Sequence, residues 1–290
     1  MHIAPSELIL NARGAIYHLD LLPDELAQTI ITVGDPGRVA EVSKFFDRIE
    51  VTRQHREFIT HTGYVGQKRL SVVSTGIGPD NIDIVLNELD ALVNIDLRER
   101  RVKDFRTSLN IIRLGTSGAL QADIPVDAVI MSSFAIGLDN LMHFYPYEPN
   151  PDEAFIGEAF QKHMRLEGQA LHPYIAEGSI RLRAAFADRF RHGITVTCPG
   201  FYGPQGRQLR GGLRFPNLID ALSTFESRQD RVTNFEMETS AIYGLGRLLG
   251  HQCLSLSAIV ANRRLQTFSA DGNAAVQAMI EEALPVIARL

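Results

Sequence analysis

Apolar runs of two kinds alternate along this chain, and that alternation is the strongest constraint on its fold. Short runs rich in β-branched residues, such as residues 29–33, indicate buried strands, whereas segments such as residues 81–93 repeat apolar residues at helical spacing. Strands that alternate with helices predict an α/β sheet covered by helices on both faces. The chain shows no internal repeat and no low-complexity linker, so we expect one domain over residues 1–290.

The expected elements follow one another along the chain. Strands are expected over 29–33, 57–65, 69–74, 110–114, 127–135, 194–197, 231–233 and 253–261. Helices are expected over 38–46, 81–93, 153–167, 184–190, 218–225, 241–249 and 273–290. The charged segment 96–107 indicates a solvated helix end and loop, and the glycine-rich segment 200–212 indicates a long polar loop.

Composition and patterning argue against several classes of protein. The net charge of −5 offers no basic face to nucleic acid or to an anionic membrane, and no apolar run approaches the ~20 residues of a membrane span. Cys198 and Cys253 lack metal-site spacing, and the nine histidines include no HExxH pattern. The N-terminus does not show the positively charged region followed by an apolar region that marks a signal peptide. We therefore expect a cytoplasmic protein without a metal.

The stretch from Thr233 to Ala241 carries charges that folding alone does not readily explain. Glu236 and Glu238 flank Met237, between a β-type run and an apolar helical run. They could be first-turn acids that complement the positive end of a helix dipole. They could also be carboxylates that a strand end presents to a cleft, as open α/β sheets commonly do. The stretch by itself leaves both interpretations open.

Two other stretches place arginine beside glycine. In Gly34-Asp-Pro-Gly-Arg38 the arginine follows a strand at a turn into a helix, which suits an oxyanion or phosphate, although a simple turn with an exposed arginine is the alternative. Arg113 lies inside an otherwise apolar strand, and a buried arginine needs an anionic partner. That partner is either a ligand, approached through the following Gly-Thr116-Ser-Gly, or an internal carboxylate.

Two loops complete the set of candidate sites. Residues 74–78 (STGIG) lack the continuation of a dinucleotide-binding motif and the lysine of a P-loop, so they indicate a close strand-to-helix turn. Phe201, Gln205 and Arg207 put an aromatic face, an amide and a guanidinium in one turn-rich segment. Such groups can stack on a planar heterocycle and read its edge, unless the segment is only an exposed flexible loop. All these stretches together fit transfer of a glycosyl group to phosphate.

The chain as a whole is similar to a known family in its motifs and in their order. The motifs are GDPGR (34–38), HREF (55–58), STGIG (74–78), RLGTSGA (113–119), FYGPQGR (201–207), NFEMETSA (234–241) and IVANR (259–263). By these motifs the sequence resembles the nucleoside phosphorylases of the trimer- or hexamer-forming type, and among those it is most similar to the uridine phosphorylases. The resemblance extends from about His18 to the C-terminus. The resemblance implies a central mixed, partly barrel-like β-sheet with helices on both faces.

The resemblance also implies a role for particular residues. Phosphate, a co-substrate rather than a cofactor, would be held by Gly34, Arg38, Arg113 and Thr116, with Arg56 coming from a neighbouring subunit. The ribose would be held by Glu238, with Met237 against the sugar, Glu236 nearby and His18 reaching across a dimer interface. The base would be recognised by Phe201, Gln205 and Arg207. Of these, Arg113, Thr116, Glu238 and Arg207 would take part in catalysis.

The implied activity is phosphorolysis of uridine to uracil and ribose 1-phosphate, in pyrimidine salvage. Purine-specific relatives have Asp where this chain has Asn262, so the resemblance favours a pyrimidine base. A purine or broad-specificity phosphorylase, a nucleosidase that uses water, and an inactive nucleoside-binding module are the alternatives. Because Arg56 and His18 would serve a neighbour's site, we expect a homo-oligomer that is at least a dimer.

The chain departs from the family pattern in four places. The Gly and Pro of the family's base loop are exchanged here, as Gly203-Pro204, with the spacing of Gln205 and Arg207 kept. Residues 79–81 are Pro-Asp-Asn in place of Gly-Pro-Ser, near where some members bind a monovalent cation between subunits beside the glutamate that is Glu57 here. That change argues against the cation. Extra residues around 94–107 and 147–179 leave the size of the oligomer open.

Overall fold

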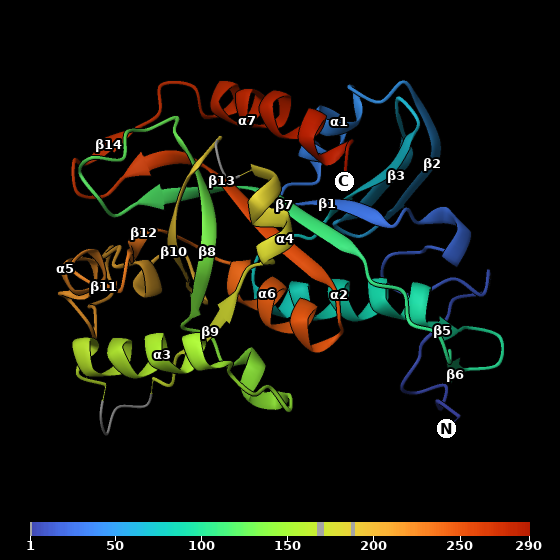
Figure 1. Cartoon of the computed structure of the whole chain (residues 1–290), viewed down its shortest axis with the longest axis horizontal. Coiled ribbons are helices and arrows are strands. Elements are labelled where there is room, and N and C mark those ends of the chain that lie inside the picture. Colours follow the sequence, from blue (N-terminus) through green and yellow to red (C-terminus); the bar gives the residue numbers. More distant parts are fainter. Residues whose placement is uncertain (1, 167–170, 187–188) are drawn as a thin grey trace.

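Five strands of one mixed β-sheet close into a barrel. The structure is a computed structural model that describes residues 2–166, 171–186 and 189–290 (Figure 1). The barrel strands pair in the order β7 (Asn110–Ala119), β13 (Gln252–Asn262), β8 (Val129–Gly137), β10 (Arg191–Thr197) and β12 (Asp230–Glu236). The ring closes where Asn234 and Phe235 of β12 pair with Ala119 and Gly118 of β7. The mixed, partly barrel-like sheet implied by the family resemblance is therefore confirmed.

The sheet continues outside the barrel from β7. β1 (Thr29–Val33) lies beside β7, followed by β4 (Lys68–Ser74), β3 (Phe58–Val65) and β2 (Arg48–His55). β1 is parallel to both β4 and β7, so the carboxyl ends of β1 and β4 lie at one edge, beside β7. The motifs that follow these two strands are thereby brought next to Arg113, because Arg113 is the register partner of Thr32.

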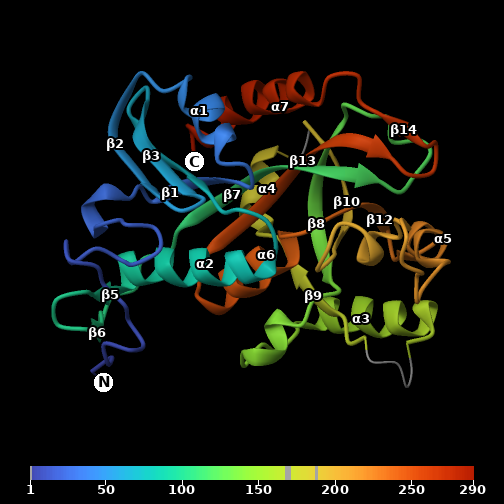
Figure 2. The ribbon, with the colours of Figure 1, turned by 180° about the vertical axis from the view of Figure 1, so that it is seen from behind.

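Helices cover both faces of this sheet, as the alternation of elements predicts. α1 (Gly37–Ser43) and α7 (Gly272–Ile287) lie over one face, and α2 (Pro79–Asn94) and α6 (Thr239–Leu248) lie over the other (Figures 1 and 2). Further helices pack on single strands: α3 (Pro151–Met164) on β9 (Tyr174–Glu177), α4 (Ile180–Phe186) on β13, and α5 (Leu218–Ser223) on β12. The remaining elements are short: β5 (Ile95–Asp96), β6 (Arg101–Val102), β11 (Glu226–Ser227), β14 (Thr267–Phe268), η1 (Pro23–Glu25), η2 (Leu141–Phe144) and η3 (Gly203–Gln205).

The apolar pattern of α2 shows why the helix layer adheres to the sheet. Its expected apolar face is fully buried and consists of Ile82, Val85, Leu86, Leu89 and Leu92. These residues share one core cluster with side chains of β1, β7 and α6. Burial of such a side chain stabilises a fold by about 1.5–3 kcal/mol, so this stripe holds α2 against the sheet.

The expected elements exist, but several boundaries differ. β7 does not end at Leu114; it runs on through the Gly-Thr-Ser-Gly segment to Ala119. The helix expected over 184–190 is α4, which begins at Ile180 and ends at Phe186, and residues 187–188 of that prediction lie outside the described residues. β2 was not predicted because it is an edge strand whose side chains are mostly exposed and polar, so its sequence lacks an apolar period.

The prediction of a helix end and loop over 96–107 was wrong in one respect. α2 ends at Asn94, and β5 and β6 then pair as a small antiparallel hairpin. The N-terminal arm lies against this hairpin, because His2 bridges to Arg101 and the Ile3 amide donates to the Arg100 carbonyl at 2.8 Å. The extra segment around 94–107 thus holds the N-terminal arm in place through backbone pairing. Within the described residues, no helix is both long and apolar enough to cross a membrane.

In the other extra segment, around 147–179, one buried carboxylate organises the described residues, which leave out 167–170. Glu153 in α3 has no exposed surface and accepts hydrogen bonds from the amides of Asn150 (2.7 Å) and Glu177 (2.8 Å) and from the Tyr147 hydroxyl (3.1 Å). It also pairs with Arg247 of α6. Glu153 therefore joins the start of α3, strand β9 and α6.

Replacing Glu153 should destabilise the protein more than replacing a surface glutamate of the same helix. In Glu153→Ala, buried donors lose their acceptor, and we expect the free energy of unfolding to fall by about 2–3 kcal/mol in chemical denaturation. Glu158→Ala is the matched control, because Glu158 is exposed on α3, and it should change stability by less than about 0.5 kcal/mol. Equal stability of the two variants would contradict this role of Glu153.

Candidate functional site

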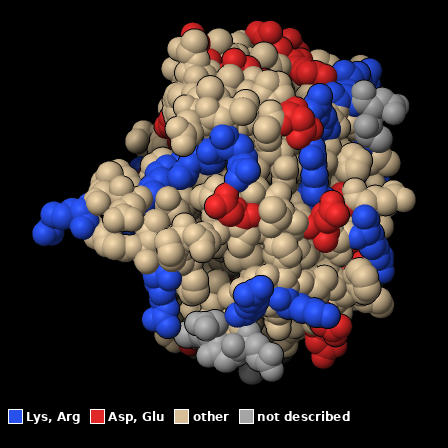
Figure 3. Space-filling model, turned by 90° about the vertical axis from the view of Figure 1, so that its left-hand side faces the viewer, with Lys and Arg blue, Asp and Glu red and all other residues tan. Residues whose placement is uncertain are grey.

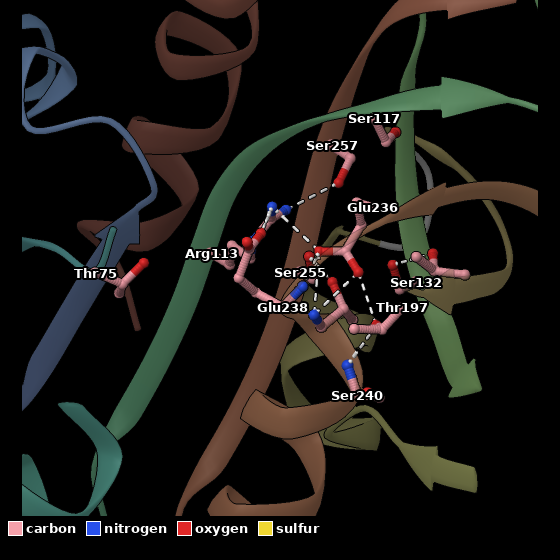
Figure 4. A network of polar contacts seen from close by, with 12 residues as sticks. Thr75, Arg113, Ser117, Ser132, Thr197, Glu236, Glu238, Ser240, Ser255 and Ser257 are labelled. Carbon is pink, nitrogen blue, oxygen red and sulfur yellow. Dashed lines mark hydrogen bonds and ion pairs between the residues drawn. The ribbon is translucent and has the colours of Figure 1, made fainter. Parts of the chain in front are cut away.

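A buried guanidinium lies between two buried carboxylates at the centre of the molecule. The Arg113 Nη2 is 2.6 Å from Glu238 Oε2 and 3.1 Å from Glu236 Oε2, and all three residues are at most 5% exposed (Figure 4). Arg113 belongs to β7, Glu236 ends β12, and Glu238 precedes α6. Of the two partners considered for Arg113 from sequence, the internal carboxylate is the one that the structure shows. Its role as a phosphate ligand stays a prediction.

Gly115 makes this arrangement possible. A Cβ at position 115 would lie 1.8 Å from Arg113 Nη1 and 2.2 Å from Cζ, so the guanidinium occupies the space that a side chain would fill. The glycines of the Gly-Thr-Ser-Gly segment were expected to open the backbone to a ligand. Gly115 instead makes room for the arginine two residues before it.

Glu236 acts as a cap for α6. Its carboxylate accepts from the amides of Glu238 (3.0 Å) and Thr239 (3.0 and 3.1 Å) and from the Thr197 hydroxyl (2.7 Å). Those amides lie at the N-terminus of the helix, where unpaired N–H groups and the positive end of the dipole favour an anion. The interpretation as a helix-start acid is therefore correct for Glu236.

Glu238 is held differently, from the turn that follows β4. The amide of Gly78 donates to Glu238 Oε1 at 2.8 Å, and Arg113 binds the other oxygen. Gly78 has φ of +99°, which favours glycine and points its N–H at the carboxylate. The STGIG motif is thus the close turn into α2 that was expected, and it orients Glu238. Met237, between the two glutamates, is half-buried.

The charges of this cluster act on one another. Burial alone lowers the pKa of Arg113, but the negative charges of Glu236 and Glu238 outweigh it and raise that pKa, so the guanidinium stays charged. Burial raises the pKa of Glu238, with Arg113 opposing and Glu236 adding to the effect. One cation is shared by two carboxylates, and it opposes the rise that burial gives to the pKa of Glu238.

A second guanidinium lies beside the first. The half-buried Arg38, in the first turn of α1, directs Nη1 at the Leu114 carbonyl at 3.5 Å. Burial lowers the pKa of Arg38, and the charge of Arg113 lowers it further. Gly34 lies just after β1, and the half-buried Thr116 lies on β7 opposite Ala258. The structure therefore brings four of the five predicted phosphate residues to β7 and the strand end beside it.

The predicted base loop forms its own ordered cluster. Arg207 stacks on the Phe201 ring at 3.8 Å and donates to the Phe201 carbonyl (2.7 Å) and to Gln205 Oε1 (2.5 Å). Gln205 is buried and Phe201 is half exposed. The alternative of an unstructured exposed loop does not fit these contacts. Whether the three side chains bind a base stays a prediction.

Phe235 connects this loop to the carboxylates, and sequence reasoning passed over it. The ring is buried beside Glu236, and the guanidinium carbons of Arg207 and Arg263 lie 5.8 and 5.7 Å from its centre. Arg263 also donates to the carbonyls of Gln205 (3.0 Å) and Gly206 (3.4 Å). Phe235 and Arg263 both belong to motifs that were recognised from the sequence. Neither was singled out, because the interpretation of those motifs rested on the neighbouring Glu236, Glu238 and Asn262.

Two predicted residues lie apart from this cluster within one chain. The ring nitrogen Nδ1 of His18 is 2.6 Å from Glu88 of α2, and the His18 carbonyl faces the His55 ring at 3.1 Å. Arg56 is exposed at the β2–β3 turn with φ of +53°. Neither has a contact with Arg113 or Glu238 among those of the described chain. Both were assigned to a neighbour's site, and that assignment stays a prediction.

The surroundings of the cluster add two observations. Surface cavities of 330, 160 and 580 Å³ are lined by residues other than Arg113, Glu236, Glu238 and the base loop, and the largest borders His18. The face at the left of Figure 1 carries basic and acidic side chains interspersed rather than one basic patch (Figure 3). Nowhere in residues 2–166, 171–186 or 189–290 do three or more His, Cys, Asp or Glu side chains group as a metal site would need.

Comparison with known proteins identifies the family. The model of a family described as the phosphorylase superfamily matches residues 28–290. This chain belongs to the phosphorylase superfamily. A uridine phosphorylase of Thermococcus kodakarensis is 30% identical over 284 residues, covering 95% of this chain and 87% of that protein. One of Haemophilus influenzae is 26% identical, covering 94% of this chain and 96% of that protein.

A solved structure agrees in fold over nearly the whole length. A nucleoside phosphorylase of Trypanosoma brucei, described as showing uridine phosphorylase activity, has a TM-score of 0.87 and 31% identity, covering 97% of this chain and 99% of that chain. The expected nucleoside phosphorylase fold is therefore confirmed. The predicted roles of single residues are not tested by this likeness.

Substitution of Gly115 should destabilise the protein, because the new side chain would displace Arg113. In Gly115→Ala the new methyl group overlaps the guanidinium, and the displaced arginine loses its carboxylates. We expect the free energy of unfolding to fall by about 1–3 kcal/mol, as for other overpacked sites. Gly211→Ala is the control, because a Cβ at Gly211 meets nothing within 4 Å. A Gly115→Ala protein as stable as the control would contradict the packing described here.

Proposed function

We propose that this chain catalyses the phosphorolysis of uridine to uracil and ribose 1-phosphate. The observation that carries the proposal is the Arg113–Glu238 cluster, which has Arg38 on one side and, through Phe235, the base loop on the other. In this proposal the anion site, the hydroxyl acceptor and the groups that recognise the base lie next to one another. The names of the uridine phosphorylases that align along nearly the whole chain support the same reaction.

In the proposed reaction, phosphate is the nucleophile. Arg38 and Arg113 hold it by charge-assisted hydrogen bonds, with Thr116 and the turn at Gly34 beside them. A phosphate oxygen forms a bond to the anomeric carbon of the ribose as the glycosidic bond breaks. The bonding electron pair leaves with the uracil nitrogen, which then takes a proton from solvent to give uracil. Because the ribose becomes cationic in the transition state, a clamped phosphate accelerates the reaction by orientation and by its charge.

Glu238 is the proposed ligand of the ribose hydroxyls. Its oxygens are fixed by Gly78 and Arg113, so its remaining lone pairs are preoriented acceptors. Glu236 supports it indirectly by capping α6, and the half-buried Met237 would pack on the sugar. His18 would complete the ribose site from the neighbouring subunit.

The base loop stabilises the departing uracil in this proposal. Arg207, with Gln205, offers donors where negative charge develops, and Phe201 offers a stacking face. Asn262 adds support for a pyrimidine, because its side chain is consumed by backbone groups: it donates to the Gln121 and Ile124 carbonyls and accepts from the Arg264 and Leu265 amides. It is therefore not disposed to read the edge of a purine. With these products, the proposed reaction would serve pyrimidine nucleoside salvage.

The decisive assay is release of base from uridine, thymidine, inosine and adenosine, each with and without phosphate. We expect phosphate-dependent release that is fastest from uridine. Cleavage that ignores phosphate would show a nucleosidase, and preference for inosine would show a purine phosphorylase. Binding of uridine without any release would show a nucleoside-binding module, and each of these three results contradicts the proposal.

We also propose that the active unit is at least a dimer, with Arg56 supplied by a neighbour. Arg38→Ala and Arg56→Ala should each raise the KM for phosphate by about tenfold or more, because each removes a charge-assisted contact. Oligomers reassembled from a mixture of the two variants should regain activity, since a chain that keeps Arg38 then meets a neighbour that keeps Arg56. Arg48→Ala, another exposed arginine of the β2–β3 hairpin, is the control. A mixture no more active than its parents would contradict a shared site.

A further inference from the structure

A fully buried serine is the third partner of the Arg113 guanidinium. Ser257 lies on β13, where the parallel register places it opposite Gly115 of β7. Arg113 Nη1 donates to the Ser257 hydroxyl oxygen at 3.2 Å, whereas both carboxylates contact Nη2 (Figure 4). The contact joins two strands that are neighbours in the barrel and 144 residues apart in sequence.

The geometry explains what this hydroxyl does to the guanidinium. Glu236 and Glu238 both contact Nη2. If these were the only contacts, the guanidinium plane could still rotate about Nη2. An arginine fork normally prefers to give two parallel N–H bonds to one carboxylate. Gly115 leaves room for the group to lie across β7, and Ser257 holds Nη1 there. Without Ser257, both ends of the fork are free to close on Glu238.

We propose that Ser257 is a positioning residue for the phosphate site. It keeps one end of the Arg113 fork off the carboxylates, so that Arg113 can still donate an N–H group to the phosphate that we propose to bind beside Arg38. Ser257 itself need not touch substrate. This inference rests on the proposed function, because it presumes that Arg113 binds phosphate.

The test compares Ser257→Ala with a matched serine variant. Ser257→Ala should raise the KM for phosphate by about five- to tenfold and leave the KM for uridine within about twofold. It should also shrink the rise in melting temperature that phosphate produces, a readout independent of turnover. Ser132→Ala is the control, because Ser132 is equally buried on β8 and bonds to Thr195 instead of Arg113. It should change neither phosphate readout.

Restoring a hydroxyl should restore the phosphate KM. Ser257→Thr keeps the hydroxyl and should bring the phosphate KM back to within about twofold of the parent value. If the added methyl group destabilises that variant, Ser257→Cys preserves the volume with a weaker hydrogen bond and should give a phosphate KM between those of serine and alanine.

The possible outcomes separate the two proposals. A phosphate KM unchanged in Ser257→Ala but raised in Arg38→Ala overturns the positioning role and leaves the phosphate site intact. A phosphate KM unchanged in both variants overturns the proposed function. Equal losses of stability and of kcat in Ser257→Ala and Ser132→Ala, with both KM values unchanged, would show a purely structural serine and also overturn the inference.

Discussion

The rest of this structure depends on one buried ionic cluster, in which Arg113 pairs with both Glu236 and Glu238. A guanidinium removed from water costs several kcal/mol unless anions and hydrogen bonds surround it, and here Glu236, Glu238 and Ser257 all do so. The cluster joins a barrel strand, the end of a second barrel strand and the start of a helix. Those elements cannot shift independently, because separation would leave a charge buried alone.

The two carboxylates share this cation but do different work. Glu236 binds backbone amides at the start of α6 and a threonine hydroxyl, so its position is determined by the fold. Glu238 is bound by the Gly78 amide, and that amide belongs to the turn between β4 and α2. Glu236 thus fixes the backbone that carries Glu238. Of these two acids, two residues apart, Glu236 supports the fold and Glu238 is the proposed ligand of the ribose.

Much of the fold could be predicted because local pattern and tertiary environment agree. The stripe on α2 and the apolar run of β1 were read correctly, since both are buried in the way their spacing implies. β2 escaped prediction because an edge strand needs few apolar residues, and the β5–β6 hairpin because two-residue strands leave no period to detect.

The site was predictable by residue type but not by contact. Glycine next to arginine suggested a ligand approach, whereas Gly115 accommodates Arg113 itself. That relation depends on where the arginine side chain folds, which no local pattern records. Ser257 could not be found at all, because its role arises from the register between β7 and β13. Likewise, the sequence could not tell which of Glu236 and Glu238 caps the helix, because that depends on the path of the backbone after β12.

The closure of the barrel has a consequence for how the protein folds. β12 meets β7 through only two residue pairs, and these join segments more than a hundred positions apart in the chain. Strand pairings between segments so far apart in sequence form late, because closing the long loop between the two strands costs conformational entropy. Phe235 is one of the closing residues, and Glu236 is the next. The candidate site is therefore among the last features that we expect to form, and a chain that has folded its helices and outer sheet but not its barrel lacks the contact between Arg113 and Glu236.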